Sequence, residues 1–323
     1  MVQVGILFIY QYRLLSVAAI LDVLDTANNL HKKSGRELPF NITLLNQESD
    51  NQNDEKTFYG YPIQSISSST APDLILIPSF TSNDIKQGIV KNQEYLPWLN
   101  KQYKAGAEIA SFCTGAFLLG ASGLLNEKVA TTHVDACTTF AAAFPAVTLK
   151  ADKTVTRDGR ICTSGGSTSS FHLLLHLVQK YCGKDIAVRI AKIFAIDMNR
   201  ESQSYFSTFS PDRNHNDDLV ATAQEKIETN YQDSATIEEI IKDIPSSRRN
   251  IVRRFKQVTG ITPIEYLQLT RVEAAKKLLE ETNKQMSEVI FNTGYNDPKA
   301  FRKVFRKNVG MTPSEYRDRF QVR

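Results

Sequence analysis

One cysteine lies in a sequence context that could make it a nucleophile. Cys113 follows the apolar run Glu108–Phe112 and precedes a helical segment that begins at Thr114, with Gly115 easing the turn. The unpaired amides and positive end of a helix favour a thiolate, and a strand–turn–helix corner can serve as a nucleophile elbow, with His133 as the candidate partner base. The pattern leaves three roles open for Cys113: a reactive or catalytic thiol, a ligand-pocket residue without turnover, or a small buried residue that fits the corner.

A second set of residues is suited to binding a polyanion, and it occurs twice. The stretches Arg253–Leu267 (RRFKQVTGITPIEYL) and Lys303–Arg317 (KVFRKNVGMTPSEYR) align without a gap at an offset of fifty residues. Each contains a basic amphipathic helix, a glycine at which that helix ends, and a Thr-Pro pair that begins the next helix. A gapless repeat indicates one supersecondary unit used twice.

Each basic helix has an apolar side and a cationic side. Ile251, Phe255 and Val258 recur at helical spacing in the first helix, and Phe301 and Phe305 do so in the second. Arginine and lysine dominate the opposite sides, which suits a DNA major groove. A solvated charged face is the alternative for either helix taken alone, but the repetition favours a shared function.

The segments around the basic helices predict how they are positioned. A shorter apolar helix and a tight turn precede each one, so we expect helix-turn-helix units over residues 236–260 and 285–310. Between them, Pro263–Glu281 has few helix breakers and predicts a long connecting helix. Two such units on one rigid helix could enter successive major grooves on one side of a duplex, about 34 Å apart.

Residues 219–323 resemble the AraC-type DNA-binding domain of bacterial transcription regulators. The resemblance lies in SSRRNIVRRFKQVTGITPIEYL, RVEAAKKLLEET and GYNDPKAFRKVFRKNVGMTPSEYR. Ile241 and Ile290 depart from it, because the family usually has a small alanine there, which predicts slightly altered packing between the helices. The resemblance implies base-edge contacts at Arg249, Val252, Arg253, Lys299, Ala300 and Lys303. The phosphate contacts that we expect are at Arg254, Lys256, Arg306 and Lys307.

Charge is distributed unevenly along the 323 residues. The net charge is +4, but residues 219–323 contain 19 Lys and Arg against 14 Asp and Glu, while the remainder contains 20 against 21. A basic C-terminal part joined to a nearly neutral N-terminal part is typical of a polyanion-binding domain attached to a domain with another function. The four cysteines lack CxxC or Cys/His zinc spacing, and no pattern indicates a metal or cofactor. The apolar run at the start is too short to span a bilayer, so we expect a cytoplasmic protein with no membrane partner.

The first two hundred residues alternate between strand and helix patterns. Buried strands are expected at Val2–Ile9, Phe40–Gln47, Asp73–Pro78 and Glu108–Ser111, with a polar loop over Glu48–Asn53. Helical patterns cover Leu14–Leu30, Tyr95–Tyr103, Ser169–Tyr181 and Lys184–Ile196. This alternation predicts an α/β sandwich with a mostly parallel sheet over residues 1–201. Residues 202–218, where periodicity stops, are the expected linker to an all-α domain at 219–323.

The first domain resembles the ThiJ/PfpI group of the class I glutamine-amidotransferase-like superfamily. The resemblance lies in ASFCTGAFLLGASGLL, VATTHVD, DGRICTSGGS and HLLLHLVQKYCG, and it implies a flavodoxin-like fold. With the AraC-type domain, the whole chain resembles regulators of the GlxA type, whose N-terminal module is taken as a sensor and dimerisation unit. That resemblance implies a homodimer and a small-molecule effector. Cys113, Thr114, His133, Ser16 and Ser79 are the expected pocket residues.

Two departures from the enzymes of this superfamily argue against catalysis. Ser16 stands where those enzymes have an acidic residue beside the cysteine, and Ser79-Phe80 replaces the glycine expected in the oxyanion hole. His172 and His176, four apart on one helix, would suit a metal, but no third ligand is evident. We therefore expect a sequence-specific transcription regulator controlled by a small metabolite. A cysteine-dependent hydrolase or hydratase of small amides or nitriles with a DNA-binding appendage, and a redox switch at Cys113, are the alternatives.

Overall fold

The central sheet of the N-terminal unit is built from short strands that are apolar on both faces. The computed structural model describes residues 1–47, 57–69, 71–81, 84–209, 211, 213 and 215–321. It divides them into two units, Met1–Gln203 and Ser204–Arg323. In the first unit eight strands form one sheet in the order β3-β4-β2-β1-β5-β6-β10-β9. The strands are β1 (Val2–Leu7), β2 (Phe40–Asn46), β3 (Thr57–Phe58), β4 (Tyr61–Ser65), β5 (Leu74–Ile77), β6 (Glu108–Phe112), β9 (Val155–Asp158) and β10 (Ile161–Ser164).

Parallel pairing runs through the middle of this sheet, and antiparallel strands stand at both edges. Neighbouring strands from β4 to β10 pair in parallel, whereas β3 and β9 pair antiparallel with β4 and β10. The central strand β5, with the sequence LILI, is completely buried, as a sheet covered on both faces requires. The expected mostly parallel α/β sandwich is therefore confirmed.

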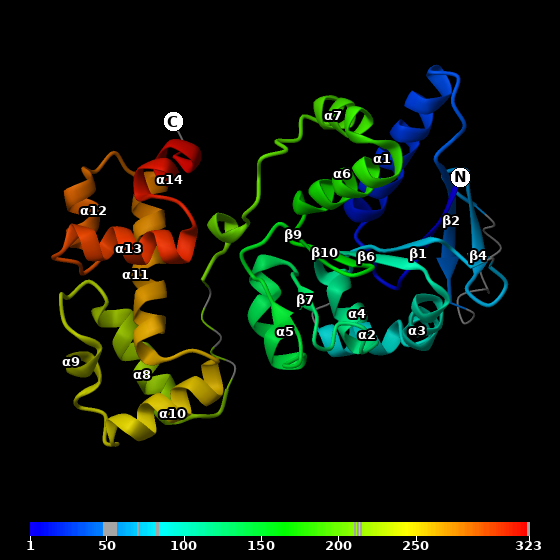
Figure 1. Cartoon of the computed structure of the whole chain (residues 1–323). Coiled ribbons are helices and arrows are strands. Elements are labelled where there is room, and N and C mark those ends of the chain that lie inside the picture. Colours follow the sequence, from blue (N-terminus) through cyan, green and yellow to red (C-terminus); the bar gives the residue numbers. More distant parts are fainter. Residues whose placement is uncertain are drawn as a thin grey trace. The chain divides into compact units, whose positions relative to one another are not determined.

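Helices cover both faces of the sheet (Figure 1). One layer holds α1 (Leu14–Lys33), α6 (Ser169–Cys182) and α7 (Lys184–Ile193). The other holds α2 (Ile85–Lys91), α3 (Tyr95–Ala105), α4 (Ala116–Ala121) and α5 (Cys137–Ala143). Each layer closes its own apolar core against the strands. Two short strands form a separate parallel ladder, β7 (Val129–Ala130) with β8 (Thr148–Leu149). The loop expected at Glu48–Asn53 lies outside the described residues.

The second unit is all-α and contains two small cores. Its helices are α8 (Asp218–Asn230), α9 (Ile237–Ile241), α10 (Arg248–Thr259), α11 (Pro263–Glu281), α12 (Met286–Asn292), α13 (Pro298–Val309) and α14 (Pro313–Phe320). Phe255 and Tyr266 pack in the first core, and their counterparts in the repeat, Phe305 and Tyr316, pack in the second. Helix α11 contributes residues to both cores, so it joins the two halves of this unit (Figure 1).

Part of the segment expected to be a linker packs into the second unit. Ser204–Phe206 form a short 3-10 turn, η4, and Tyr205 is buried in the second core. Phe209 packs edge-on against Tyr266 of the first core, with 5.1 Å between the ring centroids. The aromatic residues explain why this polar stretch packs against the second unit. Burying an aromatic ring contributes a large favourable free energy, and the polar serines beside it do not oppose that burial.

None of the helices in the described ranges is long and apolar enough to cross a membrane.

Candidate nucleic-acid interface and elbow cysteine

Both basic helices begin and end with the same local chemistry. The side chain of Ser247 accepts a hydrogen bond from the Asn250 amide at the start of α10, and Asp297 caps α13 through the Lys299 amide. Both helices end at a glycine in the left-handed region, Gly260 (φ 79°) and Gly310 (φ 83°), where a side chain would be strained. The threonines that follow, Thr262 and Thr312, form capping boxes with Glu265 and Glu315 at the starts of α11 and α14. The repeat in the sequence is therefore a repeat in structure.

The expected DNA-contacting side chains lie mainly on the exposed sides of the two helices. Ile251 and Phe255 of α10, and Phe301 and Phe305 of α13, are at most 1 % exposed and fix which side faces outward. Val258, expected in the apolar stripe, is 36 % exposed and does not belong to the core of this half. The exposed members of the expected set are Arg249, Arg253, Lys256, Lys299, Ala300, Lys303, Arg306 and Lys307, while Val252 is half-buried.

Arg254 differs from the other cations, because its guanidinium is paired inside the unit. Its Nη2 lies 2.8 Å from Oδ1 of Asp217, and its Nε donates to Oδ2 at 2.9 Å. Asp217 also caps α8 by accepting a hydrogen bond from the Val220 amide. Burial alone would raise the pKa of Asp217, but the hydrogen bonds from Arg254 and Val220 outweigh it and lower that pKa. Arg254 therefore holds α10 to α8 in this structure instead of standing free for phosphate.

One exposed cation of α13, Arg302, was not in the expected set. The fifty-residue offset aligns Arg302 with Val252 of α10, so the repeat register contained the signal that would have identified it. Its exposure on the same helix as Lys299 and Lys303 makes it a third cation available to a nucleic acid on this side.

A buried arginine on α11 holds the two helix-turn-helix halves together. Arg271 is 8 % exposed, and its guanidinium donates to the carbonyl oxygens of Tyr231 (2.8 Å), Asp233 (2.7 Å) and Ala235 (3.2 Å) in the loop before α9. It also lies over the ring of Tyr295, 5.2 Å from the centroid, in the turn between α12 and α13. The spacing of α10 and α13 thus depends on this one side chain as well as on α11.

The corner at Cys113 has the backbone conformation of a nucleophile elbow. Cys113 follows β6 with φ 55°, a value that a residue with a side chain seldom adopts. A Cβ at Gly115 would lie 2.6 Å from the carbonyl oxygens of Ile77 and Pro78, so only glycine allows α4 to begin so close to β5. The sequence therefore placed the strand–turn–helix corner correctly.

The thiol at this corner is buried, and burial disfavours its thiolate form. Cys113 is 4 % exposed, and burial raises its pKa even though the backbone amides of Ser167 and Thr114 and the charge of Arg13 act in the opposite direction. The expected gain in thiolate from the helix end is thus outweighed by desolvation. Oxidation and nucleophilic attack both require the thiolate, so this environment disfavours the redox and catalytic roles.

The polar groups expected around Cys113 bond to one another. The amide of Ser79, the candidate oxyanion donor, donates to Oγ of Ser16 at 3.0 Å. Thr114 Oγ1 accepts from the Phe80 amide at 3.0 Å and donates to the Phe80 carbonyl at 2.7 Å. Ser16, in the place of the expected acid, therefore occupies the donor that a tetrahedral intermediate would need.

His133 acts locally as the first residue of a helical turn. Its Nδ1 accepts a hydrogen bond from the Asp135 amide at 3.2 Å, and the described residues include no hydrogen bond between His133 and Cys113. His172 is the first of the two histidines on α6 that could suit a metal. Its ring nitrogens lie 3.3 Å from the carbonyl oxygen of Thr168 and 2.9 Å from that of Asp197. The described residues form no group of three or more potential metal ligands.

Comparisons with known proteins identify both units. Residues 32–180 match the DJ-1/PfpI family, and residues 242–319 match a helix-turn-helix domain. The chain is 24% identical over 98% of its length to the HTH-type transcriptional regulator GbdR of Pseudomonas aeruginosa, covering 84% of that protein. It is 24% identical to the HTH-type transcriptional regulator GlxA of Rhizobium meliloti, with 68% of each chain covered. A transcriptional regulator structure from Vibrio parahaemolyticus shares the fold over 59% of this chain and 98% of its own, with a TM-score of 0.50 and 20% identity.

A DJ-1/PfpI-type domain followed by a double helix-turn-helix domain defines a DNA-binding transcription regulator. Within that class, the chain combines a DJ-1/PfpI domain with an AraC-type helix-turn-helix domain, and its homologues include regulators named GbdR and GlxA.

Proposed function

We propose that this regulator reads promoter DNA with α10 and α13 and that a small molecule held by its N-terminal unit controls the binding. The observation that carries the first part is the matched exposure of cations on two helices of the same register. Arg249 and Arg253 of α10 correspond to Lys299 and Lys303 of α13, and all four are exposed. Arginine and lysine in this position suit guanine edges, whereas Lys256, Arg306 and Lys307 suit the phosphates alongside.

The spacing of the two helices supports one continuous site on DNA. Helix α11 has 19 residues, and Arg271 fastens the loop before α9 to the turn before α13. A helix of this length spans about 28 Å at 1.5 Å per residue, which is close to the rise of one turn of B-DNA. The two helices are therefore suited to successive major grooves on one side of a duplex.

The experiment that tests DNA reading is selection from a pool of random duplexes with the full-length chain at low salt. We expect enrichment of duplexes that carry two conserved segments about 10 bp apart, because each helix reads one groove. Salt should weaken the binding steeply, since phosphate contacts release counterions. Recovery of an unenriched pool would remove the proposal.

We further propose that the N-terminal unit binds an effector and does not catalyse a reaction. Its candidate oxyanion amide is bonded to Ser16, and burial raises the pKa of Cys113. The expected pocket residues Ser16, Ser79, Thr114, His133 and Cys113 all lie near the ends of β5 and β6 or in the segment after β7, but most of their polar groups are already used. They are better placed to keep this corner rigid than to turn over a substrate.

Replacing Cys113 by serine tests the hydrolase alternative. We expect the variant to bind the selected duplex within about twofold of the wild-type affinity, because a thiol buried inside the N-terminal unit offers no surface to DNA. Neither protein should hydrolyse small amides or nitriles. Turnover by the wild-type chain that disappears in Cys113→Ser would instead establish the enzyme.

The regulatory mechanism that we propose is a population shift in a homodimer in the cytoplasm, where promoter DNA is found. A small molecule that binds one arrangement of the two DNA-binding units more tightly than the other favours that arrangement, and only one arrangement spans paired half-sites. Sedimentation at working concentration tests the dimer, and a change in duplex affinity on adding effector tests the coupling.

A further inference from the structure

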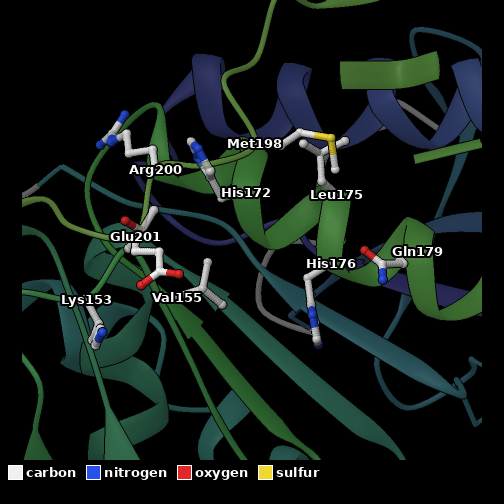
Figure 2. A pocket seen from close by; sticks show the side chains of 10 residues that line it. Lys153, Val155, His172, Leu175, His176, Gln179, Met198, Arg200 and Glu201 are labelled. Carbon is white, nitrogen blue, oxygen red and sulfur yellow. The ribbon is translucent and has the colours of Figure 1, made fainter. Parts of the chain in front are cut away.

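The chain leaves the N-terminal unit as a short strand that is added beside the start of β9. The Thr154 amide donates to the Glu201 carbonyl at 3.0 Å, and the Gln203 amide donates to the Asp152 carbonyl at 2.9 Å. Figure 2 shows Glu201 beside the start of β9. Gln203 is the last residue of this unit, because the DNA-binding unit begins at Ser204.

The side chain of Gln203 is buried and hydrogen-bonded at both ends of its amide. It is 1 % exposed, and its Nε2 donates to the carbonyl oxygens of Thr132 and Ala151, both at 2.9 Å. Its Oε1 accepts from the Gly166 amide at 3.0 Å. A Cβ at Gly165 would lie 2.5 Å from Cδ of Gln203, so the turn after β10 needs glycine there to come so close. These contacts hold Gln203 in one position.

The groups that hold Gln203 also lead to the corner at Cys113. Thr132, whose carbonyl accepts from Gln203, donates its own Oγ1 to the Cys113 carbonyl at 3.0 Å, and Thr132 is fully buried. Gly166, whose amide donates to Gln203, precedes Ser167, and the Ser167 amide hydrogen-bonds to the Cys113 thiol. The corner and the last residue of the unit are therefore joined by two short paths.

The turn on the second path has an unfavourable backbone conformation. Ser167 has φ 37°, a value that a residue with a side chain seldom adopts, so the neighbouring contacts must hold it there. A Cβ at Gly166 would lie 2.5 Å from Cδ2 of His133, so the turn is also packed against one of the expected pocket residues. Losing the contact with Cys113 would let this turn relax and withdraw its amide from Gln203.

The DNA-binding unit holds the chain again almost at once. Tyr205 is buried in the second core of that unit, and the guanidinium of Arg319 lies over its ring, 4.9 Å from the centroid. The ammonium group of Lys276 on α11 donates to the Ser207 carbonyl. Residues two apart in sequence are separated by at most about 7 Å, so the chain has little slack to absorb a movement of Gln203 before Tyr205.

We propose that Gln203 is the positioning residue through which the corner at Cys113 controls the DNA-binding unit. While its hydrogen bonds are made, the chain enters that unit from a fixed point, and the two units of a dimer lose little conformational freedom when they bind paired half-sites. A small molecule that takes over the contacts of Thr132 or Ser167 with the corner releases Gln203 and weakens this binding. The inference rests on the function proposed above and specifies how a ligand in the N-terminal unit acts.

The duplex affinity of two variants of the full-length chain tests the coupling. Gln203→Leu replaces the amide by an apolar group of similar size, and Thr132→Val removes only the hydroxyl that bonds to Cys113. We expect each to weaken binding of a duplex with two copies of the selected site by at least about fivefold, the lower end of ordinary allosteric coupling. Binding of a duplex with one copy should stay within about twofold, because neither residue shares a partner with the cationic helices.

Tyr95→Phe is the matched control. It also removes one buried hydroxyl from the N-terminal unit, but this hydroxyl donates to the carbonyl oxygens of Phe8 and Leu45 and takes no part in either path. It should leave the binding of both duplexes unchanged. Urea unfolding followed by Trp98 fluorescence establishes that each variant is folded before its affinity is compared.

A double variant tests whether the two residues act along one path. The loss in Thr132→Val/Gln203→Leu should be no larger than in Gln203→Leu alone, because releasing Gln203 already disconnects Thr132 from the DNA-binding unit. Gln203→Leu also leaves buried backbone groups unpaired. If that cost prevents folding, Thr132→Val and the exchange of the Gly166 amide decide the question.

Hydrogen exchange at Gly166 gives a measurement that a purely structural role would not affect. Coupling is reciprocal, so the duplex with two copies of the site must in turn stabilise the hydrogen bonds of Gln203. The Gly166 amide donates to Gln203, and its exchange should slow when this duplex is added to the wild-type chain. In Thr132→Val the same amide should exchange faster without DNA.

The outcomes separate the coupling from the DNA-reading function. Equal losses on both duplexes, additive losses in the double variant, or a Gly166 amide that is indifferent to the duplex would each overturn the coupling. A chain that selects its duplex and binds it alike in every variant defeats the coupling and leaves the DNA-reading function intact. A wild-type chain that selects no duplex defeats the DNA-reading function, and the coupling falls with it.

Discussion

Replacing Arg271 by alanine is expected to destabilise the DNA-binding unit by about 3 kcal/mol, because hydrogen bonds from a charged group contribute about 1.5–3 kcal/mol and buried carbonyls left without donors add to the loss. Its guanidinium serves three carbonyl oxygens between Tyr231 and Ala235 and contacts the ring of Tyr295. Lysine at this position should recover only part of the stability, since one ammonium cannot span the same acceptors.

The chain offers an internal control for this measurement. Its one tryptophan, Trp98, lies in the core of the N-terminal unit, so its fluorescence follows the unfolding of that unit. Helical circular dichroism also follows the all-α unit. In urea, Arg271→Ala should move part of the dichroism transition to lower concentration and leave the Trp98 transition in place. Lys277→Ala, an exposed change on the same helix, should shift neither by more than about 0.5 kcal/mol. A common shift of both transitions would contradict the local role of Arg271.

The double helix-turn-helix was predictable because its signals are local and occur twice. Gly260 and Gly310, the two Thr-Pro starts and the paired phenylalanines each specify a helix end or a buried side within a few residues. The mostly parallel sheet was predictable for a similar reason, since runs such as LILI can only be buried on both faces. Boundaries were less accurate where single aromatic residues, such as Tyr205 and Phe209, found partners far along the chain.

The chemistry of the sites was less predictable than their location. The corner at Cys113 follows from its neighbours, but the closure of its surroundings depends on Ser16 reaching an amide sixty-three residues away. In the sequence Arg254 does not differ from the neighbouring cations. Only the structure shows that it pairs with Asp217, thirty-seven residues earlier. The pairing of Ser202 with Lys153 was missed because a single bridge carries no periodicity. Long-range pairing of individual polar groups is what a sequence pattern does not contain.

Removing Arg253 or Lys303 is expected to weaken binding of the selected duplex by about 1–3 kcal/mol, roughly 5- to 150-fold, and to relax base preference in one segment only. Both side chains are exposed, so their loss should leave the unfolding of the chain unchanged. Arg253 is held in place by Asn250, whose Oδ1 accepts from its Nη2 at 3.0 Å, so the guanidinium needs little further ordering on binding. A lysine has a flexible stem and no planar fork of donors, so we expect the smaller loss at Lys303.

Lys256→Ala and Lys307→Ala are the matched controls, because both lysines are exposed on the same helices and lie closer to the helix ends. As phosphate contacts they should weaken every duplex alike and reduce the slope of log affinity against log salt by about 1 each. The double variant Arg253→Ala/Lys303→Ala should show additive losses, since the two residues lie in separate helix-turn-helix halves and share no partner. Selection repeated with each single variant distinguishes the two classes: base-reading variants recover a degenerate segment, and phosphate variants recover the original sequence at lower yield. If all four single variants behaved alike, the outward sides of α10 and α13 would not face the bases, and Arg302 would be the next cation to test.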